Sequence, residues 1–214
     1  MSRGWVAAAL VGGALVVGLL SGCSPSATYL GSTSQGLYVK VPTKWTVFDS
    51  ATLQRLGLVN PNANALSAAE GATYPAFVTL SSADHRLVSK NLAGPYPWAM
   101  AAAFSVGSQD QASLSLQGLE DVIFNVDQAQ QAGQPVAALA PTKTIVRGAL
   151  RGTQVAFELA TPNGPLVFEQ VALLNTPTNK LWLLVTGCSP ACFNAHRHVL
   201  EDIVRSFTVT GQGG

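Results

Sequence analysis

The chain has 214 residues, of which 48% are hydrophobic and only 11% are charged, with a formal net charge of +1. A near-neutral chain without clusters of Lys or Arg argues against nucleic-acid binding and against attachment to membranes by charge. Its length suits a single domain with a substantial core.

The first residues have the pattern of a secretory signal. Arg3 is the only charge before the apolar run Trp5–Leu20, and Ser21-Gly22-Cys23 follows. That run has about 16 residues, fewer than the roughly 20 that span a bilayer, which favours a cleaved signal over a transmembrane helix. The segment resembles a bacterial lipobox, in which the thiol of Cys23 is acylated. We therefore expect a palmitate-bearing lipoprotein on the extracytoplasmic face of the cell membrane.

Cleavage before Cys23 divides the chain into four expected parts. Residues 1–22 are the signal peptide, and removing them leaves 192 residues and takes Arg3 out of the charge balance. Cys23 and a Ser/Thr/Gly-rich segment, 23–36, form the lipidated end and a flexible tether. Residues 37–210 form the folded domain, and 211–214 form a disordered tail. Abundant Ala and Gly with few Lys suggest a GC-rich genome such as that of an actinobacterium.

The first half of the mature chain predicts short strands and one short helix. Asp49 or Ser50 can cap a helix that ends at Leu56, before Gly57. A Gly- and Pro-rich cluster, 94–97, predicts a break in the chain. The expected strands, from alternation or from short apolar runs, are 37–41, 74–81 and 98–106.

The second half predicts a helix, a strand meander and a closing helix. Leu116, Leu119, Ile123 and Val126 recur at helical spacing, which predicts a helix over 113–132. The closing helix is expected from about Ala191 to Phe207. Four strands are expected between them: 144–149, 152–160, 166–174 and 181–186. The order predicts a single α+β domain, an antiparallel sheet with helices packed against it.

Three short motifs resemble the PsbP-like fold, and in particular the exported actinobacterial lipoproteins of the LpqN type. They are Tyr38-Val-Lys-Val-Pro42 with Trp45 behind it, Arg147-Gly148 before paired strands, and a last helix ending over Ile203–Val209. The likeness spans roughly Leu37 to Val209. It implies a non-enzymatic binding or assembly module without a cofactor, and the family has no catalytic motif to carry over.

Cys188 and Cys192 are the two cysteines of the mature domain after Cys23. In an exported protein such a pair predicts a disulfide. The alternative is a zinc site in which both thiolates join His196, four residues past Cys192 on the expected helix. His196 lies on the apolar stripe and is expected in the core, whereas His198 is expected to face water. Ser189 suits a helix cap better than a nucleophile, because the local motif lacks the closing Gly of a hydrolase elbow.

Glu158 and Glu169 form a candidate carboxylate pair. If Asn163-Gly164 is a two-residue hairpin turn, the two side chains face each other with Cβ atoms about 4.5–5.5 Å apart. Such a pair could share a proton or bind a cation. The simpler interpretation is a solvated face with a basic partner from nearby, Lys143, Arg147 or Arg151.

Two aromatic residues, Tyr96 and Trp98, lie beside the Pro-rich turn and are expected to be accessible for contact with a ligand or partner. Trp45 and Trp182 are expected in the core. We therefore expect a membrane-anchored, non-catalytic module that binds an envelope protein or an apolar lipid or cell-wall ligand. The alternatives are an envelope hydrolase that uses Glu158 and Glu169 and a metal-binding lipoprotein.

Overall fold

The computed structural model describes residues 27–57, 75–85, 92–107, 114–122, 126–131 and 133–210. The expected signal peptide, Cys23 and the expected tail 211–214 lie outside the described residues. Among the described residues, no helix is long and apolar enough to cross a bilayer.

Eleven strands and five helices are described, and their bounds follow in chain order. The strands are β1 Ala27–Ser32, β2 Leu37–Pro42, β3 Thr46–Phe48, β4 Pro75–Ser82, β5 Trp98–Ser105, β6 Val136–Ala138, β7 Lys143–Arg147, β8 Leu150–Thr161, β9 Gly164–Asn175, β10 Lys180–Cys188 and β11 Thr208–Val209. The helices are α1 Ser50–Arg55, α3 Leu116–Glu120, α4 Val126–Gln131, α5 Pro190–Ala195 and α6 Arg197–Ser206.

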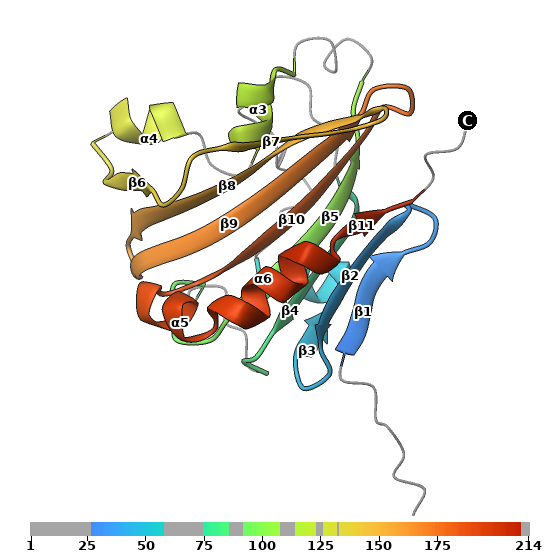
Figure 1. Ribbon diagram of the computed structural model, residues 1–214. Helices are drawn as coiled ribbons and strands as arrows, with labels where there is room; N and C mark the ends of the chain where they lie inside the picture. The colour runs from blue at the N-terminus through green and yellow to red at the C-terminus, as the bar shows by residue number, and fades with distance from the viewer. Residues whose placement is uncertain are drawn as a thin grey trace, which may run out of the picture.

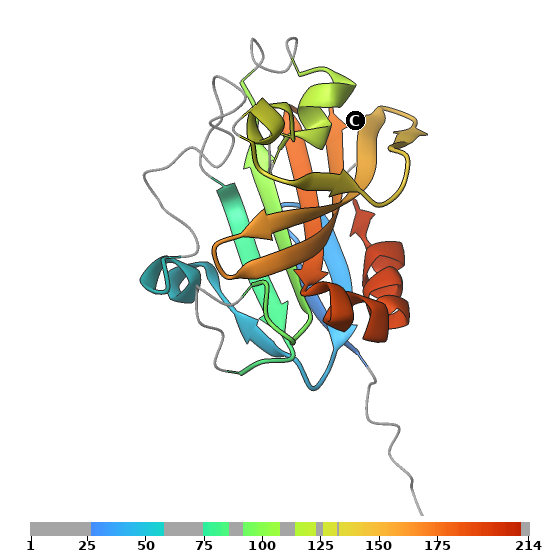
Figure 2. The same cartoon turned by 90° about the vertical axis from the view of Figure 1, so that its left-hand side faces the viewer.

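The strands form two antiparallel sheets (Figure 1). The large sheet has the order β3-β4-β5-β10-β9-β8-β6, and β7 pairs with the same edge of β8 as β6, at residues 150–154 of β8. The small sheet has the order β1-β2-β11. Helix α1 lies on one side of the large sheet, and α5 and α6 lie on the other (Figure 2). The predicted α+β class, an antiparallel sheet with helices packed against it, is confirmed.

Both faces of the large sheet are apolar, so the domain has two hydrophobic clusters. On one face, Leu119 of α3 packs with residues such as Phe168 and Leu183. On the other face, Trp182 packs with Val39 of the small sheet and with Leu200 of α6. Strand β10 contributes buried side chains to both clusters and lies between β5 and β9. The unbroken apolar run Trp182–Val185 predicts a strand that is buried on both faces and therefore central, and the structure confirms this.

Strand β1 lies inside the segment that the composition predicts to be a flexible tether. Tyr29 pairs with Lys40 and Leu30 pairs with Val39 in an antiparallel ladder. Leu30 is only 2% exposed and joins the second hydrophobic cluster. The short run Thr28-Tyr29-Leu30 has strand-forming side chains, and their pairing outweighs the Ser and Gly around them. The tether prediction is therefore wrong for residues 27–32.

The helix predicted over 113–132 is two short helices, α3 and α4, rather than one. Ser115 caps α3 and accepts a hydrogen bond from the Gly118 N–H, 3.0 Å away. The Asp121 side chain accepts the Val126 N–H at 3.3 Å. A side chain that takes a backbone N–H in this way competes with the helical ladder. Gly133, with a φ of +72°, ends α4 as predicted.

Two glycines offer a matched test of this packing. A Cβ at Gly152 in β8 would lie 2.1 Å from the Ala172 carbonyl oxygen, whereas one at Gly118 in α3 would meet its nearest atom at 3.5 Å. We expect Gly152→Ala to lower the free energy of unfolding by about 1–3 kcal/mol through overpacking. Gly118→Ala should raise it by about 0.5–1 kcal/mol, because Ala loses less backbone entropy in a helix. Urea unfolding measures both, and equal midpoints would contradict the β8–β9 packing.

Candidate functional site

A groove separates helices α5 and α6 from the part of the large sheet formed by β7, β8 and β9. It consists of two adjacent hollows with volumes of ≈ 300 Å³ and ≈ 570 Å³. Gln154, Glu169 and Glu201 line both hollows, so these three side chains form the centre of the groove. Polar residues thus occupy the centre of the groove, and both apolar and charged residues line it around them.

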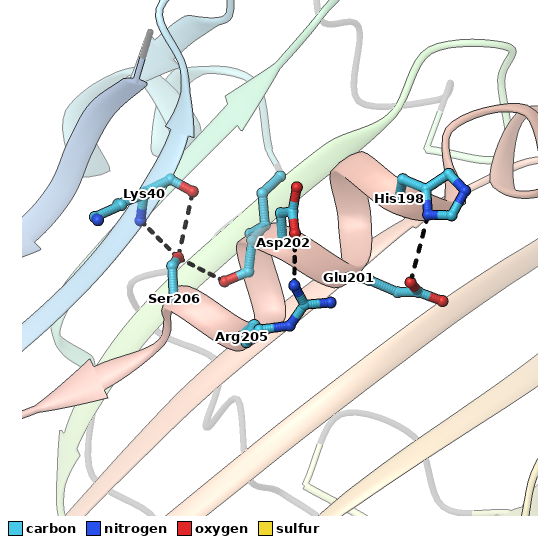
Figure 3. A network of polar contacts seen from close by, with 7 residues as sticks. Lys40, His198, Glu201, Asp202, Arg205 and Ser206 are labelled. Carbon is cyan, nitrogen blue, oxygen red and sulfur yellow. Dashed lines mark hydrogen bonds and ion pairs between the residues drawn. The ribbon is translucent and has the colours of Figure 1, made fainter. Parts of the chain in front are cut away.

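Helix α6 forms one wall of the groove. Arg197, Glu201 and Arg205 follow one another at intervals of four residues, which places them on one face of the helix. Leu200 and Ile203 are buried in the second hydrophobic cluster and fix the orientation of that face. Arg205 pairs with Asp202 at 3.0 Å, and His198 lies 3.9 Å from Glu201 (Figure 3). These exposed contacts stabilise the helix only slightly, so the charges of Glu201 and Arg205 remain available at the groove.

The floor of the groove comes from alternate residues of β8 and β9. Glu158 of β8 and Glu169 and Val171 of β9 point to the same face of the sheet as α6. Ile145 of β7 and Phe207, just after α6, add apolar surface to the smaller hollow. The floor therefore alternates charged and apolar side chains.

The β8–β9 register corrects the predicted pairing of Glu158 and Glu169. Thr161 pairs with Gly164, so the turn residues are 162–163 and each glutamate has an apolar cross-strand partner: Val167 opposite Glu158, and Ala156 opposite Glu169. A turn at Asn163-Gly164 would have paired two prolines, Pro162 and Pro165. Neither proline has an N–H to donate, so that register lacks the hydrogen bonds that close a hairpin.

The two glutamates are instead diagonal neighbours on one face, where Cα atoms lie about 7–8 Å apart. Both still line the larger hollow. The prediction that the two glutamates lie directly opposite each other is wrong, but the prediction that they lie close together on one face of the hairpin is correct.

Glu169 is the most perturbed carboxylate of the groove. Burial raises the pKa of its carboxyl group above the usual value, and the charge of Glu201 raises the pKa further. The hydrogen bond that Gln154 Nε2 donates to Glu169 Oε1, 2.5 Å long, lowers the pKa, as does the charge of Lys143. Burial is the strongest of these effects. A cation that entered the groove would stabilise the ionised form of Glu169.

Several charges around the groove have no ion-pair partner within the described ranges. Lys143 and Arg147 of β7, Arg197 of α6 and Glu158 of β8 all line it without a contact of 4.0 Å or less to an opposite charge. The predicted ion pair of the glutamates with Lys143, Arg147 or Arg151 does not form: Arg151 instead donates to the Leu114 carbonyl oxygen on the other face. The groove thus offers unpaired charges of both signs.

Cys188 and Cys192 fit the predicted disulfide, with their sulfur atoms 2.14 Å apart. The bond joins the end of β10 to the first turn of α5, and Ser189 caps α5 by accepting the Cys192 N–H. It uses both thiolates that the zinc alternative requires. No group of three or more His, Cys, Asp or Glu side chains is placed to hold a metal in the part of the chain that is described.

The closing helix predicted over 191–207 is interrupted at His196, which ends α5 and precedes α6. His196 is exposed, so its predicted place in the core is wrong. Because the helix is interrupted there, His196 leaves the apolar face, whereas Leu200 and Ile203 of the same expected face are buried as predicted. His198 faces water as predicted, with a side chain that is 97% exposed.

Tyr96 and Trp98, the two aromatic residues beside the Pro-rich turn, differ in their exposure to solvent. Trp98 is 5% exposed, and its Nε1–H donates to the Leu92 carbonyl oxygen at 2.9 Å. Its predicted accessibility is wrong, because Trp98 begins β5 and lies over Gly187 of the paired strand. Tyr96 is 49% exposed but lines neither hollow. Trp182 lies in the core as predicted, whereas Trp45, also predicted there, is only partly buried against the second hydrophobic cluster.

Sequence reasoning did not find Gln154, Arg197, Glu201 or Arg205. The interval of four between the three α6 residues was a visible signal, but charges at that spacing usually mark a solvated helix face. Only the tertiary structure shows that this face forms a wall of the groove.

Comparison with known proteins leaves the family open. No protein-family model matches the chain, and no curated protein matches it. Among solved structures, PsbP of the cyanobacterium Synechocystis sp. PCC 6803 is similar, with 11% identity over 91% of this chain and 99% of that one and a TM-score of 0.49. The Ran-binding protein Mog1p of Saccharomyces cerevisiae shares 13% identity over 87% of this chain and 96% of its own, with a TM-score of 0.46.

A protein of unknown function from Pseudomonas aeruginosa matches at 9% identity over 89% of this chain and 100% of its own, with a TM-score of 0.41. Likenesses at this level say nothing about what the present chain binds. Membership of the LpqN type stays a prediction.

The disulfide is expected to stabilise the wall that α5 provides. Cys188→Ser/Cys192→Ser should lower the free energy of unfolding by about 2 kcal/mol, because a short loop in the unfolded chain is no longer closed. Denaturant unfolding of the variant and of the oxidised wild type measures the difference. Wild type treated with a reductant is the control and should match the variant. An unchanged midpoint after reduction would contradict a structural disulfide.

The raised pKa of Glu169 predicts that the stability of the fold depends on pH. A carboxyl group with a raised pKa in the folded state stabilises the fold below 4.5, its usual value, and loses that contribution as pH rises through the folded pKa. Glu169→Gln should therefore match wild type in acid and have the higher melting temperature near neutral pH. Glu201→Gln, which removes the neighbouring charge, should lower the Glu169 pKa in a carboxyl NMR titration. A melting-temperature difference that is independent of pH would contradict this assignment.

Proposed function

We propose that this chain is an exported lipoprotein whose domain binds a segment of a partner protein in the α5–α6 groove, without catalysis. The signal-like first residues and the lipobox at Leu20-Ser21-Gly22-Cys23 support an anchor on the extracytoplasmic face of the membrane. The groove, with unpaired charges of both signs around a partly apolar floor, is the observation that carries the binding function.

The centre of the groove favours a protein segment over an apolar ligand. Sites for lipid-like molecules are mostly apolar, with few polar groups. Here an acyl chain would cover Gln154, Glu169 and Glu201 without offering them hydrogen bonds, and a buried unpaired carboxylate is costly. A peptide segment that carries a Lys or Arg side chain can satisfy the two carboxylates and place apolar side chains on Val171 and Ile145.

Strand β7 provides a second means of recognition beside the groove. It is an edge strand, and no other described strand pairs with it on the side away from β8. Val146 is 72% exposed on it, and Ile145 points into the smaller hollow. An extended peptide can hydrogen-bond to such an edge and place alternate side chains in an adjacent groove. The charged residues at its two ends, Lys143 and Arg147, disfavour aggregation through pairing with the strands of unrelated chains.

The arrangement of the polar groups supports a non-catalytic role. Ser189 is used as the cap of α5, and no described histidine is hydrogen-bonded to a hydroxyl or thiol that could act as a nucleophile. The alternative hydrolase would use Glu158 and Glu169, which share the larger hollow. Loss of an envelope hydrolytic activity in the variant Glu158→Gln/Glu169→Gln would establish that alternative in place of ours.

Site-specific photo-cross-linking in intact cells tests the groove. A photoreactive residue at Leu139, which is 47% exposed and lines the larger hollow, should capture a defined partner protein. The same residue at Leu116, 38% exposed on the opposite face of the sheet, is the matched control and should not. Adding Glu169→Lys should reduce capture at Leu139 by about tenfold or more, as for loss of a close charge pair. Equal capture at both positions would refute the groove as the binding site.

A further inference from the structure

The outer face of the small sheet has a chemistry and a position that the groove does not explain. We propose that this face, formed by β1 and β2, rests on the anionic lipid headgroups of the membrane to which Cys23 is attached. The inference rests on the proposed lipid anchor and adds which side of the domain meets the bilayer.

The chain between the expected anchor at Cys23 and the first strand is short. Cys23 precedes Ala27, the first residue of β1, by four residues. Four extended residues span at most about 14 Å. The end of the small sheet that holds Ala27 and its partner Pro42 is therefore held close to the headgroups. The long tether expected from composition would have allowed any orientation, and this short one does not.

The outward-facing side chains of β1 and β2 include tyrosines. Burial of Leu30, Val39 and Val41 directs their neighbours outward, and the outward set contains Tyr29, which is 63% exposed. The Tyr38 ring lies across Gly31 on the same face. Tyrosine, with an apolar ring and a polar hydroxyl, is favoured at the boundary between lipid and water. The face thus presents aromatic rings where the short tether holds the domain.

The charged residues on and beside this face are basic. Lys40 is exposed opposite Tyr29, with its Nζ 5.7 Å from the centre of the Tyr29 ring, and Lys44 is exposed just past the end of β2. The outward residues of β1 and β2 include no acidic side chain. The nearest acids along the chain and at the end of α6 are engaged: Asp49 caps α1, and Asp202 pairs with Arg205. Basic residues near an anionic leaflet are attracted to it.

This local charge agrees with the neutrality of the whole chain. Two lysines cannot attach a neutral domain to a membrane, and the acyl chains make that attachment. Once the domain is held there, the lysines and tyrosines select its orientation. In Figure 1 β1 lies at one side of the molecule and β6 and β8 lie at the other, so this orientation leaves the groove open to a partner.

Amine acylation with mass-spectrometric readout tests the orientation. Native acylated protein is placed in vesicles of phosphatidylcholine with phosphatidylglycerol, and labelling rates are compared with the same protein in detergent. Lys40 and Lys44 should react about fivefold more slowly in the vesicles, as expected for basic residues held at an anionic surface. Lys143, exposed on β7 at the other side of the domain, is the matched control and should react equally in both.

Each other outcome overturns the proposal in a distinct way. Acylated protein whose Lys40 and Lys44 react as fast as in detergent would refute the surface and leave the anchor intact. Protein without an acyl mass on Cys23 would overturn the anchor and this surface together. Protection that appears in detergent and grows with protein concentration would identify a second copy, paired along the outer edge of β1, as the occupant instead.

Charge reversal checks the same surface independently of lysine chemistry. In the anionic vesicles Lys40→Glu/Lys44→Glu should raise the nitration rate of Tyr29 to its detergent value, whereas Lys143→Glu should leave that rate low. Equal rates in the two variants would refute the role of these lysines.

Discussion

Strand β10 is buried on both faces, and this constraint governs the rest of the domain. Leu181 and Leu183 point to one face of the large sheet, and Trp182 and Leu184 point to the other, so both faces must be covered. On one face α1 and α3 provide cover. On the other, the small sheet and α6 cover β5 and β10 but leave much of the length of β8 and β9 open. The groove is the part of this face that α6 borders but does not cover, and its charged residues limit the size of the exposed apolar patch.

The sequence predicted the strands better than their pairing. Apolar runs and alternation are local signals, so β2, β4, β5 and β7 to β10 were found within a few residues of their bounds. Register depends on which backbone groups can bond. The Asn163-Gly164 signal was strong, but Pro162 and Pro165 had no N–H for the pairing it implied. Because prolines lack a hydrogen-bond donor, their positions favour a different hairpin register, in which Glu158 and Glu169 are diagonal neighbours.

The site was harder to predict than the fold because it joins residues far apart in the sequence. Gln154, Glu169 and Glu201 belong to three different elements, and nothing in their local surroundings relates them. The end of the tether was missed for a related reason. Leu30 alone among Ser, Thr and Gly looks like a chance apolar residue, and it is buried only because β2 supplies a partner strand. The helix breaks near Asp121 and at His196 likewise follow from side-chain and tertiary contacts that periodicity does not report.

Helix α6 connects the two surfaces to which we assign functions. At its C-terminal end Ser206 accepts the Lys40 N–H at 2.9 Å and so fixes α6 to β2 of the small sheet (Figure 3). Along its length Arg197, Glu201 and Arg205 face the groove. The packing of Leu200 and Ile203 into the second hydrophobic cluster holds this helix against the sheet. An orientation imposed on β1 and β2 by the membrane is therefore imposed on the groove as well, so a short anchor determines the direction from which a partner approaches.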